Sequence, residues 1–290
     1  MHAFQHFAQA PCTSARHQCV LATCPHLLHQ PAMPIAKLSQ RAVLAISGAD
    51  ARAFLQGQIT NDIDQLTPCA PLYAGLLSPQ GKCLFAFILF AVDGDSILLD
   101  CAATQAESLA KRLSMFKLRR AVSIAPTPLA VFASWGERSS HPADPRSPAA
   151  GARWVAAAEP VTATLEDWHA HRLPLALPEA DELGSDDLLW LETNARDLNG
   201  VSFTKGCYVG QENTARMHHR GKVRKALLAV QLSAVATSTT LRAGDKDAGS
   251  LRGTPHGALQ MALVRTEYLD QPLSIDGAPA PVIRPEWLTA

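Results

Sequence analysis

The chain has 290 residues, 47% of them hydrophobic and 18% charged, which is an ordinary globular composition with room for about two domains. Its 26 basic and 26 acidic side chains balance, so the protein as a whole has no field to attract DNA or an anionic membrane. The longest apolar run, 83–92, is much shorter than the roughly 20 residues of a spanning helix. This composition excludes a membrane protein and disfavours nucleic-acid binding as the main function.

The segment 1–33 differs from the rest of the chain. Before Met33 it has no acidic residue and a single basic one, Arg16, yet it holds three of the seven cysteines and five of the eleven histidines. Paired metal-ligand spacing is missing, and so is the Arg-rich amphipathic pattern of a transit peptide. We expect a disordered extension or a start codon assigned too early. With thiols that show no disulfide pattern, the sequence predicts a cytoplasmic protein.

Strand and helix patterns alternate from residue 42 onward. Apolar runs at 72–77 and 83–90 flank the Pro/Gly turn 78–81 and predict a hairpin. Asp50 is placed to cap a helix that starts at residue 51. Further strands are expected at 42–46, 96–100, 121–125, 129–134 and 153–157. Because hairpins outnumber βαβ crossovers, the pattern favours an α+β fold of mixed antiparallel sheets and helices.

Two helices are expected in this part of the chain, over 104–120 and 165–172. In the first, Leu109, Leu113 and Phe116 share an apolar face, and basic residues fill the final turn. A loop rich in Pro, Ser and Ala, 136–151, separates two substructures. After residue 222 short apolar segments recur at even spacing, which is typical of a small β-barrel. We therefore predict a body over 34–221 and a C-terminal barrel over 222–290.

The stretch 205–225 carries a net charge of plus five in a neutral chain. Gly206 and Gly210 flank Cys207, as a sharp turn or a close backbone approach requires. Residues 211–219 fit a helix, so Cys207 lies just before a helix N-terminus. A helix N-terminus carries a partial positive charge, and this charge, together with Lys205, favours the thiolate form of Cys207. The motif thus predicts a reactive cysteine, and the alternative is a buried, inert cysteine in a turn.

The run Lys205-Gly-Cys-Tyr-Val-Gly-Gln-Glu212, ending in Ala-Arg216, resembles the signature of the folate-binding YgfZ proteins, which are distant relatives of the glycine-cleavage T-protein. The blocks 47–62 and 76–82 resemble the N-terminal region and hairpin of the same family. The resemblance covers most of 33–225 and is weak in the C-terminal barrel. It implies a T-protein-like region that holds a reduced folate and a protein that assists the assembly or repair of iron–sulfur clusters in other enzymes.

The resemblance also implies site residues. Glu192 matches the glutamate that faces the pterin in the T-protein, and one carboxylate can accept both N–H donors of the pterin edge. Tyr208, Gln211 and Arg216 of the signature are expected to help bind tetrahydrofolate, while Cys207 and Lys205 would carry the chemistry. The expected partners are iron–sulfur client enzymes or cluster-assembly proteins, and the chain is expected to be a monomer without a metal of its own.

One departure from the T-protein separates two functions. The T-protein carries an aspartate pair in the strand after the hairpin glycine, and here the corresponding register falls on Phe85-Ala86. Neither side chain can relay a proton. A folate-dependent aminomethyltransferase is therefore the alternative to an accessory factor, so whether the protein is an enzyme stays open. A third function is a folate-binding regulatory module linked to tRNA modification.

Histidines and the basic cluster admit other interpretations. His169, His171, His218 and His219 lack a third ligand at a defined spacing, so we expect surface residues and no zinc site. The cations of 205–225 suit the glutamate tail of a folate better than tRNA.

Overall fold

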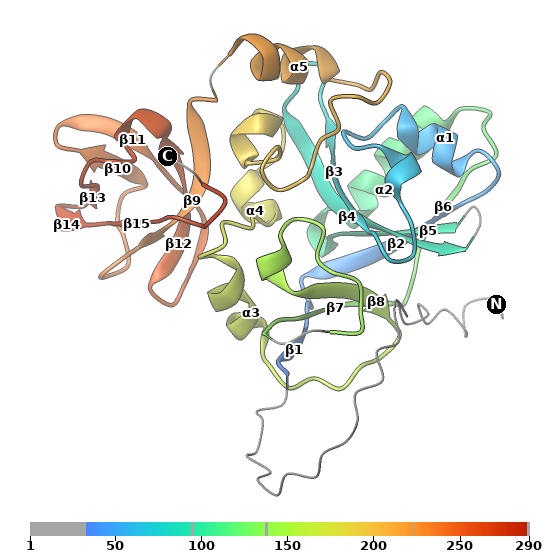
Figure 1. Cartoon of the computed structure of the whole chain (residues 1–290), viewed down its shortest axis with the longest axis horizontal. Helices are drawn as coiled ribbons and strands as arrows, with labels where there is room; N and C mark the ends of the chain where they lie inside the picture. The colour runs from blue at the N-terminus through green and yellow to red at the C-terminus, as the bar shows by residue number, and fades with distance from the viewer. Residues whose placement is uncertain (1–32, 94–95, 137–138, 222, 289–290) are drawn as a thin grey trace, which may run out of the picture.

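The structure is a computed structural model that describes residues 33–93, 96–136, 139–221 and 223–288. The predictions for segment 1–33 therefore lie outside the described residues, apart from Met33. Three sheets form the molecule, two in the body and one at the C-terminal end (Figure 1). The predicted α+β class of mixed antiparallel sheets and helices is confirmed. No helix in the described ranges is long and apolar enough to cross a membrane.

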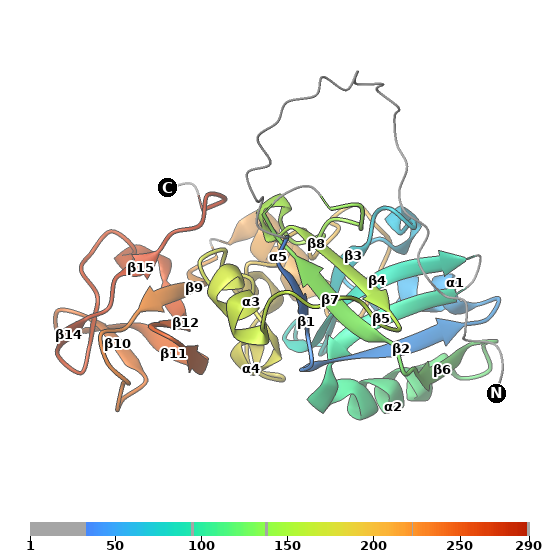
Figure 2. The ribbon, with the colours of Figure 1, turned by 90° about the horizontal axis from the view of Figure 1, so that it is seen from below.

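The first sheet has five strands in the order β3-β4-β5-β2-β6, all paired antiparallel. Its strands are β2 (Arg41–Ser47), β3 (Leu72–Leu77), β4 (Cys83–Asp93), β5 (Ser96–Ala102) and β6 (Ser123–Pro126). Helices α1 (Ala51–Gln56) and α2 (Ala106–Lys117) bury apolar side chains against it. Figure 2 shows α2 along the outer side of this sheet. The predicted hairpin is confirmed, because β3 and β4 pair antiparallel on the two sides of the Pro/Gly turn.

Two details of this region differ from the prediction. Asp50 does not cap α1, because its carboxylate accepts a hydrogen bond from the N–H of Ala121 instead, at 2.7 Å. Phe116 does not join the buried face of α2 with Leu109 and Leu113, and 40% of it is exposed. Helical spacing alone cannot distinguish these outcomes, because both depend on residues from other elements.

The second sheet has three strands in the order β1-β7-β8. They are β1 (Ile35–Lys37), β7 (Ala130–Ser134) and β8 (Ala152–Ala156). Helix α3 (Leu165–Arg172) follows it and begins with a capping box in which Thr164 and Asp167 bond each other's backbone N–H groups. Helix α4 (Ala180–Leu183) and the 3₁₀ turn η4 (Trp190–Thr193) lead from there to the motif.

The C-terminal sheet has seven strands in the order β14-β13-β10-β11-β12-β9-β15, and it curls in Figure 1. Its strands are β9 (Lys225–Gln231), β10 (Thr240–Ala243), β11 (Lys246–His256), β12 (Leu259–Arg265), β13 (Ser274–Ile275), β14 (Ala278–Pro279) and β15 (Val282–Ile283). Of these strands, β9, β12, β13 and β15 correspond to the apolar segments that the sequence shows at 226–232, 258–264, 273–275 and 281–283. Strands β10, β11 and β14 show no such apolar segment, because polar residues interrupt the first two and β14 has only two residues.

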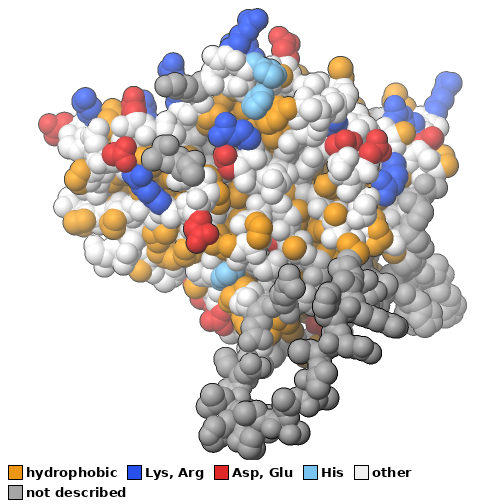
Figure 3. Space-filling view, viewed as in Figure 1, with side chains coloured by type: hydrophobic (Ala, Val, Ile, Leu, Met, Phe, Trp, Pro, Cys, Tyr) orange, Lys and Arg blue, Asp and Glu red, His pale blue; other side chains and the backbone are white. Residues whose placement is uncertain are grey.

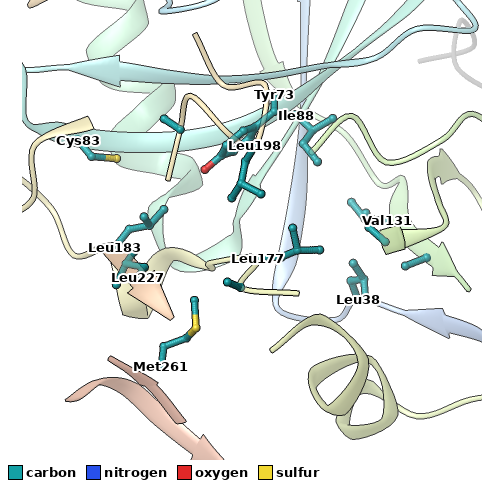
Figure 4. Packing of buried hydrophobic residues seen from close by; sticks show 14 of the residues in the cluster. Leu38, Tyr73, Cys83, Ile88, Val131, Leu177, Leu183, Leu198, Leu227 and Met261 are labelled. Carbon is teal, nitrogen blue, oxygen red and sulfur yellow. The ribbon is translucent and has the colours of Figure 1, made fainter. Parts of the chain in front are cut away.

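An apolar junction joins the body to the C-terminal sheet. Tyr73, Cys83 and Leu198 of the body belong to one buried cluster with Leu227 of β9 and Met261 of β12 (Figure 4). All five residues are at most 3% exposed. The contact between these two parts is therefore driven by the removal of apolar surface from water.

An ionic junction joins the first sheet to the second. Its members are six buried charged side chains, three basic and three acidic: Arg41, Asp100, Asp144, Arg146, Arg153 and Glu179. Asp100 of β5 is fully buried and accepts from Arg41 of β2 at 2.6 Å and from Arg153 of β8 at 2.8 Å. Three cations and three anions leave the cluster neutral, which burial requires.

Two carboxylates of the ionic junction, Glu179 and Asp144, have lowered pKa values. Burial opposes ionisation, but the guanidinium groups of Arg41, Arg153 and Arg146 hold the pKa of Glu179 far below its usual range. Asp144, which accepts two hydrogen bonds from the Arg146 side chain, also has a lowered pKa.

Candidate functional site

The motif, residues 205–212, forms a turn that leads into helix α5 (Gln211–Arg220). Cys207 lies in this turn and is exposed. It precedes α5 as predicted, and Gly210 at the N-cap has φ +82°, a backbone conformation that glycine adopts without strain. In the face shown in Figure 3, histidine and Lys or Arg side chains gather over α5. The sequence therefore presents a thiol at the surface, beside the N-terminus of a ten-residue helix.

The two glycines that flank the cysteine have different roles. A Cβ on Gly210 would lie 2.4 Å from the carbonyl oxygen of Ser78 in the β3–β4 turn, whereas a Cβ on Gly206 would meet nothing within 4 Å. Asn213 of α5 also donates to the carbonyl of Gln80, at 2.9 Å. The start of α5 is thus held against the tip of the hairpin. The prediction of a close backbone approach is confirmed for Gly210 and not for Gly206.

Lys205 fixes the other side of the turn. Its Nζ donates to the carbonyls of Gln56, Ile59 and Asn61 at 2.7, 2.7 and 2.8 Å, which uses all three hydrogens of the ammonium. Only 8% of the residue is exposed, and burial lowers its pKa to about 8. The ammonium thereby ties the motif to the segment after α1. Among the described contacts, none joins Lys205 to the Cys207 thiol.

The remaining signature residues point in different directions. Tyr208 is 8% exposed, burial raises its pKa to about 12, and its ring centre lies 5.1 Å from the Lys205 Nζ. The Gln211 side-chain oxygen accepts from the N–H of Tyr208 at 3.4 Å. Arg216 is exposed on α5. In this geometry Tyr208 and Gln211 shape the turn, and Arg216 faces solvent.

The free cysteines of the described chain fall into two classes. Cys83 and Cys101 are buried in β4 and β5, and burial raises the pKa of each thiol to about 12. Cys207 is exposed and lies in the turn. Because the thiolate is the reactive form, Cys207 is the free thiol best placed for chemistry with another molecule.

Glu192 lies in η4, which is bonded to the hairpin through the N–H of Trp190 and the carbonyl of Gly81 at 3.0 Å. One carboxylate oxygen accepts from the N–H of Leu189 at 3.3 Å, and the other is 3.7 Å from the Lys225 Nζ. The side chain is 14% exposed, and that of Lys225 is 41% exposed. The second oxygen of Glu192 therefore has only a long ion pair with a partly exposed partner and is the one available to a ligand.

A basic pocket of about 900 Å³ begins at Lys225. Arg220, Arg224, Lys225 and Arg265 line it, and Glu267 is the acidic member of the lining. The first three belong to the predicted basic cluster of 205–225, while Arg265 is the last residue of β12 and carries no sequence signal beyond its charge. Lys222 of that cluster lies outside the described residues.

The residues of the turn and those of the basic pocket lie at opposite ends of α5. Lys205, Cys207, Tyr208 and Gln211 surround its N-terminus, whereas Arg220 at its C-terminus lines the pocket with Lys225, the ion-pair partner of Glu192. Ten helical residues span about 15 Å. Neither Cys207 nor any other residue of 205–211 lines the basic pocket.

Asn194 connects the two groups to the C-terminal sheet. It follows η4 in the left-handed conformation, with φ +62°, and is 3% exposed. Its side chain donates to the carbonyl of Leu227 at 2.6 Å and accepts from the N–H of the same residue at 3.1 Å. Local sequence patterns do not indicate this contact, because its partner lies 33 residues further along the chain.

The histidines are placed less uniformly than expected. His218 and His219 are exposed on α5, and His218 stacks on Phe203 with ring centres 3.7 Å apart. His169, expected at the surface, is only 7% exposed. Its Nδ1 accepts from the Nε of Arg172 at 2.8 Å, and its ring stacks on His256. Contacts with β11 bury it.

The fold defines the protein as T-protein-like. The chain is similar to the glycine cleavage system aminomethyltransferase T from Bartonella henselae, with a TM-score of 0.62 over 88% of this chain and 86% of that one. At 11% identity this likeness concerns the fold alone. Residues 224–290 match the family described as CAF17, C-terminal beta-barrel domain, in agreement with the predicted barrel region.

Curated relatives then show the family. The human mitochondrial iron-sulfur cluster assembly factor IBA57 is 34% identical, over 82% of this chain and 79% of its own length. The mouse protein of the same name is 32% identical, over 87% and 84%. The chain belongs to the IBA57 family. The YgfZ resemblance is thus confirmed at the level of the T-protein-like fold and a family named for iron–sulfur cluster assembly.

The predicted compartment is wrong. The human, mouse and Neurospora crassa relatives are all named as mitochondrial proteins, which contradicts a cytoplasmic assignment. Composition misled the prediction, because thiols without a disulfide pattern occur in more than one reducing compartment.

Proposed function

We propose that the chain is an accessory factor for the assembly of iron–sulfur clusters, and that Cys207 is its reactive group. The names of the family's members support the role. The observation that supports Cys207 as the reactive group is the contrast in exposure among the free cysteines of the described residues. Cys207 lies at the surface, whereas Cys83 and Cys101 are buried. The partners would be cluster-assembly proteins or client enzymes.

The cluster is cargo in this proposal. Stable clusters usually need four thiolates, and no group of three or more Cys, His, Asp or Glu side chains in the described residues could hold a metal ion. A single exposed thiolate can instead supply one ligand to a cluster that a partner holds with the others. Lys205 and Gly210 then act as positioning residues, because they fix the turn against the body from both sides.

A reduced folate is the proposed cofactor, and the residues present fit it. Glu192 can accept the N–H donors of a pterin edge once the 3.7 Å contact with Lys225 opens. The cations of the basic pocket suit the carboxylates of the glutamate tail, and 900 Å³ is within the range of ligand pockets. When bound, a reduced folate supplies a readily oxidised pterin ring. This chain's own contribution is to bind and orient it.

The alternative of aminomethyl transfer has less support. Phe85 and Ala86 lie in β4, paired with Leu76 and Gly75, and neither can take part in proton transfer. The likeness to the aminomethyltransferase is one of fold, and it carries no activity.

The thiol is tested with Cys207→Ser, in a chain from which Cys12, Cys19, Cys24 and Cys69 have been removed, so that Cys83, Cys101 and Cys207 are the cysteines that remain. In the parent, Cys207 should react with iodoacetamide near neutral pH faster than Cys83 and Cys101. The serine variant should keep its melting temperature and folate affinity, yet fail to restore cluster-dependent enzymes in a strain that lacks the protein. Gly206→Ala, in the open part of the same turn, is the matched control and should restore them.

Two results would change this assignment. Full restoration by the serine variant would make the motif a structural turn. If the wild-type chain bound folate but did not affect cluster-dependent enzymes, the regulatory module would be the better description.

The folate site is tested with Glu192→Gln by titration calorimetry with tetrahydrofolate. An amide offers one acceptor to paired donors, so affinity should fall by about 1.5–3 kcal/mol, or roughly ten- to hundredfold. Glu212→Gln, at an exposed position of α5, should leave affinity unchanged. Equal affinities for wild type and Glu192→Gln would remove Glu192 from the site.

A further inference from the structure

Exposed apolar side chains gather at one place, the end of α2 and the turn that follows it. We call residues 111–120 the α2 tip. Met115, Phe116 and Leu118 are 56%, 40% and 84% exposed, and they make up three of the five exposed large hydrophobic residues in the described chain. The other two, Val161 and Val235, stand singly. Such a concentration in four consecutive positions marks a contact surface.

The backbone holds Leu118 outward. Helix α2 ends at Lys117, and Leu118 has φ +50°, a value that L side chains rarely adopt. The Nζ of Lys117 donates to the carbonyl of Val122 at 2.7 Å and so fixes the turn in this form. This conformation is unfavourable for leucine, and the exposed Leu118 side chain makes no buried contact within the body that would compensate for it. Burial of Leu118 against a partner outside the chain would compensate for it.

The apolar side chains on the inner face of α2 are already buried within the body. Leu109 and Leu113 are fully buried against the first sheet. Figure 2 shows α2 on the outer side of that sheet, away from the C-terminal sheet and from α5. The tip is therefore free of both the thiol and the basic pocket, and it can be occupied while they work.

Cations surround the exposed apolar residues. Five of them lie within the tip: Lys111, Arg112, Lys117, Arg119 and Arg120. Glu107 is the single acidic residue between 106 and 122. The guanidinium of Arg112 lies over the Phe116 ring at 4.8 Å. Within the described residues none of the five pairs with a carboxylate, so the positive charge of the tip is uncompensated.

We propose that the α2 tip is a peripheral anchor for a surface of anionic lipids. Met115, Phe116 and Leu118 would enter the headgroup region, and the flanking cations would bind lipid phosphates. Reversible membrane attachment needs both an apolar and a basic signal, and the tip has both. Three protruding side chains at the end of a helix suit a deformable lipid surface better than a protein partner, which needs a much larger matched area.

The test is co-sedimentation of the full chain with vesicles. Wild type should bind vesicles of phosphatidylcholine with 30% phosphatidylglycerol and should not bind pure phosphatidylcholine. Raising the salt concentration from 0.1 to 0.5 M should release it, because charges at the surface are screened.

Variants separate the two signals. Leu118→Ser should weaken binding by about tenfold, the effect of losing one inserted leucine. Lys111→Gln and Arg119→Gln should each weaken it roughly fivefold. Val235→Ser and Lys246→Gln, at exposed positions of the C-terminal region, are the matched controls and should bind like wild type. All substituted positions are exposed, so each variant should fold. Circular dichroism of each variant checks this.

Three outcomes would overturn the proposal: no binding to the anionic vesicles, equal binding by Leu118→Ser and wild type, or equal loss in the Val235→Ser control. Binding of an acidic amphipathic peptide at the tip, without binding of vesicles, would replace the lipid surface with a protein partner.

Discussion

The two junctions of the molecule are built from opposite kinds of side chain. Six buried charges form the ionic junction between the first and second sheets, whereas Leu227 and Met261 reach into an apolar cluster at the junction with the C-terminal sheet. Apolar contacts stabilise almost any close packing, but buried charges are tolerated only when every partner is in place. The ionic junction therefore depends on a single arrangement of its sheets, and the apolar junction depends mainly on contact.

Removing one partner from the ionic junction should have the largest effect. Asp100→Ala leaves Arg41 and Arg153 buried without their shared carboxylate, so the free energy of unfolding should fall by about 3–5 kcal/mol. Urea denaturation measures it. Asp197→Ala, which removes an exposed partner of Arg196, should cost less than 1 kcal/mol. If both variants cost the same, the buried charges do not define this junction.

A truncation in the apolar junction should cost somewhat less. Leu227→Ala removes a fully buried side chain from β9, and the lost contacts and the cavity should lower the free energy of unfolding by about 2–4 kcal/mol. Val235→Ala, 84% exposed, serves as control in the same urea titration and should have no effect. A cost above that of Asp100→Ala would reverse the proposed order of the two junctions.

The smallest expected effect is a pH dependence at the contact between α3 and β11. Burial and the neighbouring Arg172 and His256 lower the pKa of His169 to about 4, from about 6.5 in an unfolded chain. Between these values the unfolded chain binds a proton that the folded chain does not, so stability falls as the pH drops from 6.5 towards 4. The loss should reach about 1–2 kcal/mol by pH 5.

His169→Asn should flatten this dependence between pH 6.5 and 5. His141 and His171, whose pKa values burial also lowers, remain in the variant, so the difference between the two curves isolates His169. Parallel curves would mean that His169 does not carry the effect.

Local patterns predicted most elements of the body but not the contacts between them. Helix α3 and the β3–β4 hairpin followed from apolar spacing and turn residues within a few positions. The ionic junction could not be predicted, because Asp100 and Arg153 are 53 residues apart and each stands alone in an apolar strand. The burial of His169 could not be predicted for the same reason, because it depends on contacts with β11.

The site shows the same limit. The turn at Cys207 and the need for a glycine at 210 were readable from the motif, since both concern the local backbone. The role of Lys205 was not, because its three carbonyl partners lie 144 to 149 residues earlier. Net charge misled in another way: a total of zero conceals the uncompensated cations of the α2 tip.

The side chain of Asn194 closes a loop. By bonding both backbone groups of Leu227, one amide fastens the two ends of a segment that contains the motif turn and all of α5. Leu227 itself belongs to β9, so the segment is attached to the C-terminal sheet at its base and to the hairpin at its tip. The position of the segment that carries the thiol is therefore set by contacts with both the C-terminal sheet and the hairpin.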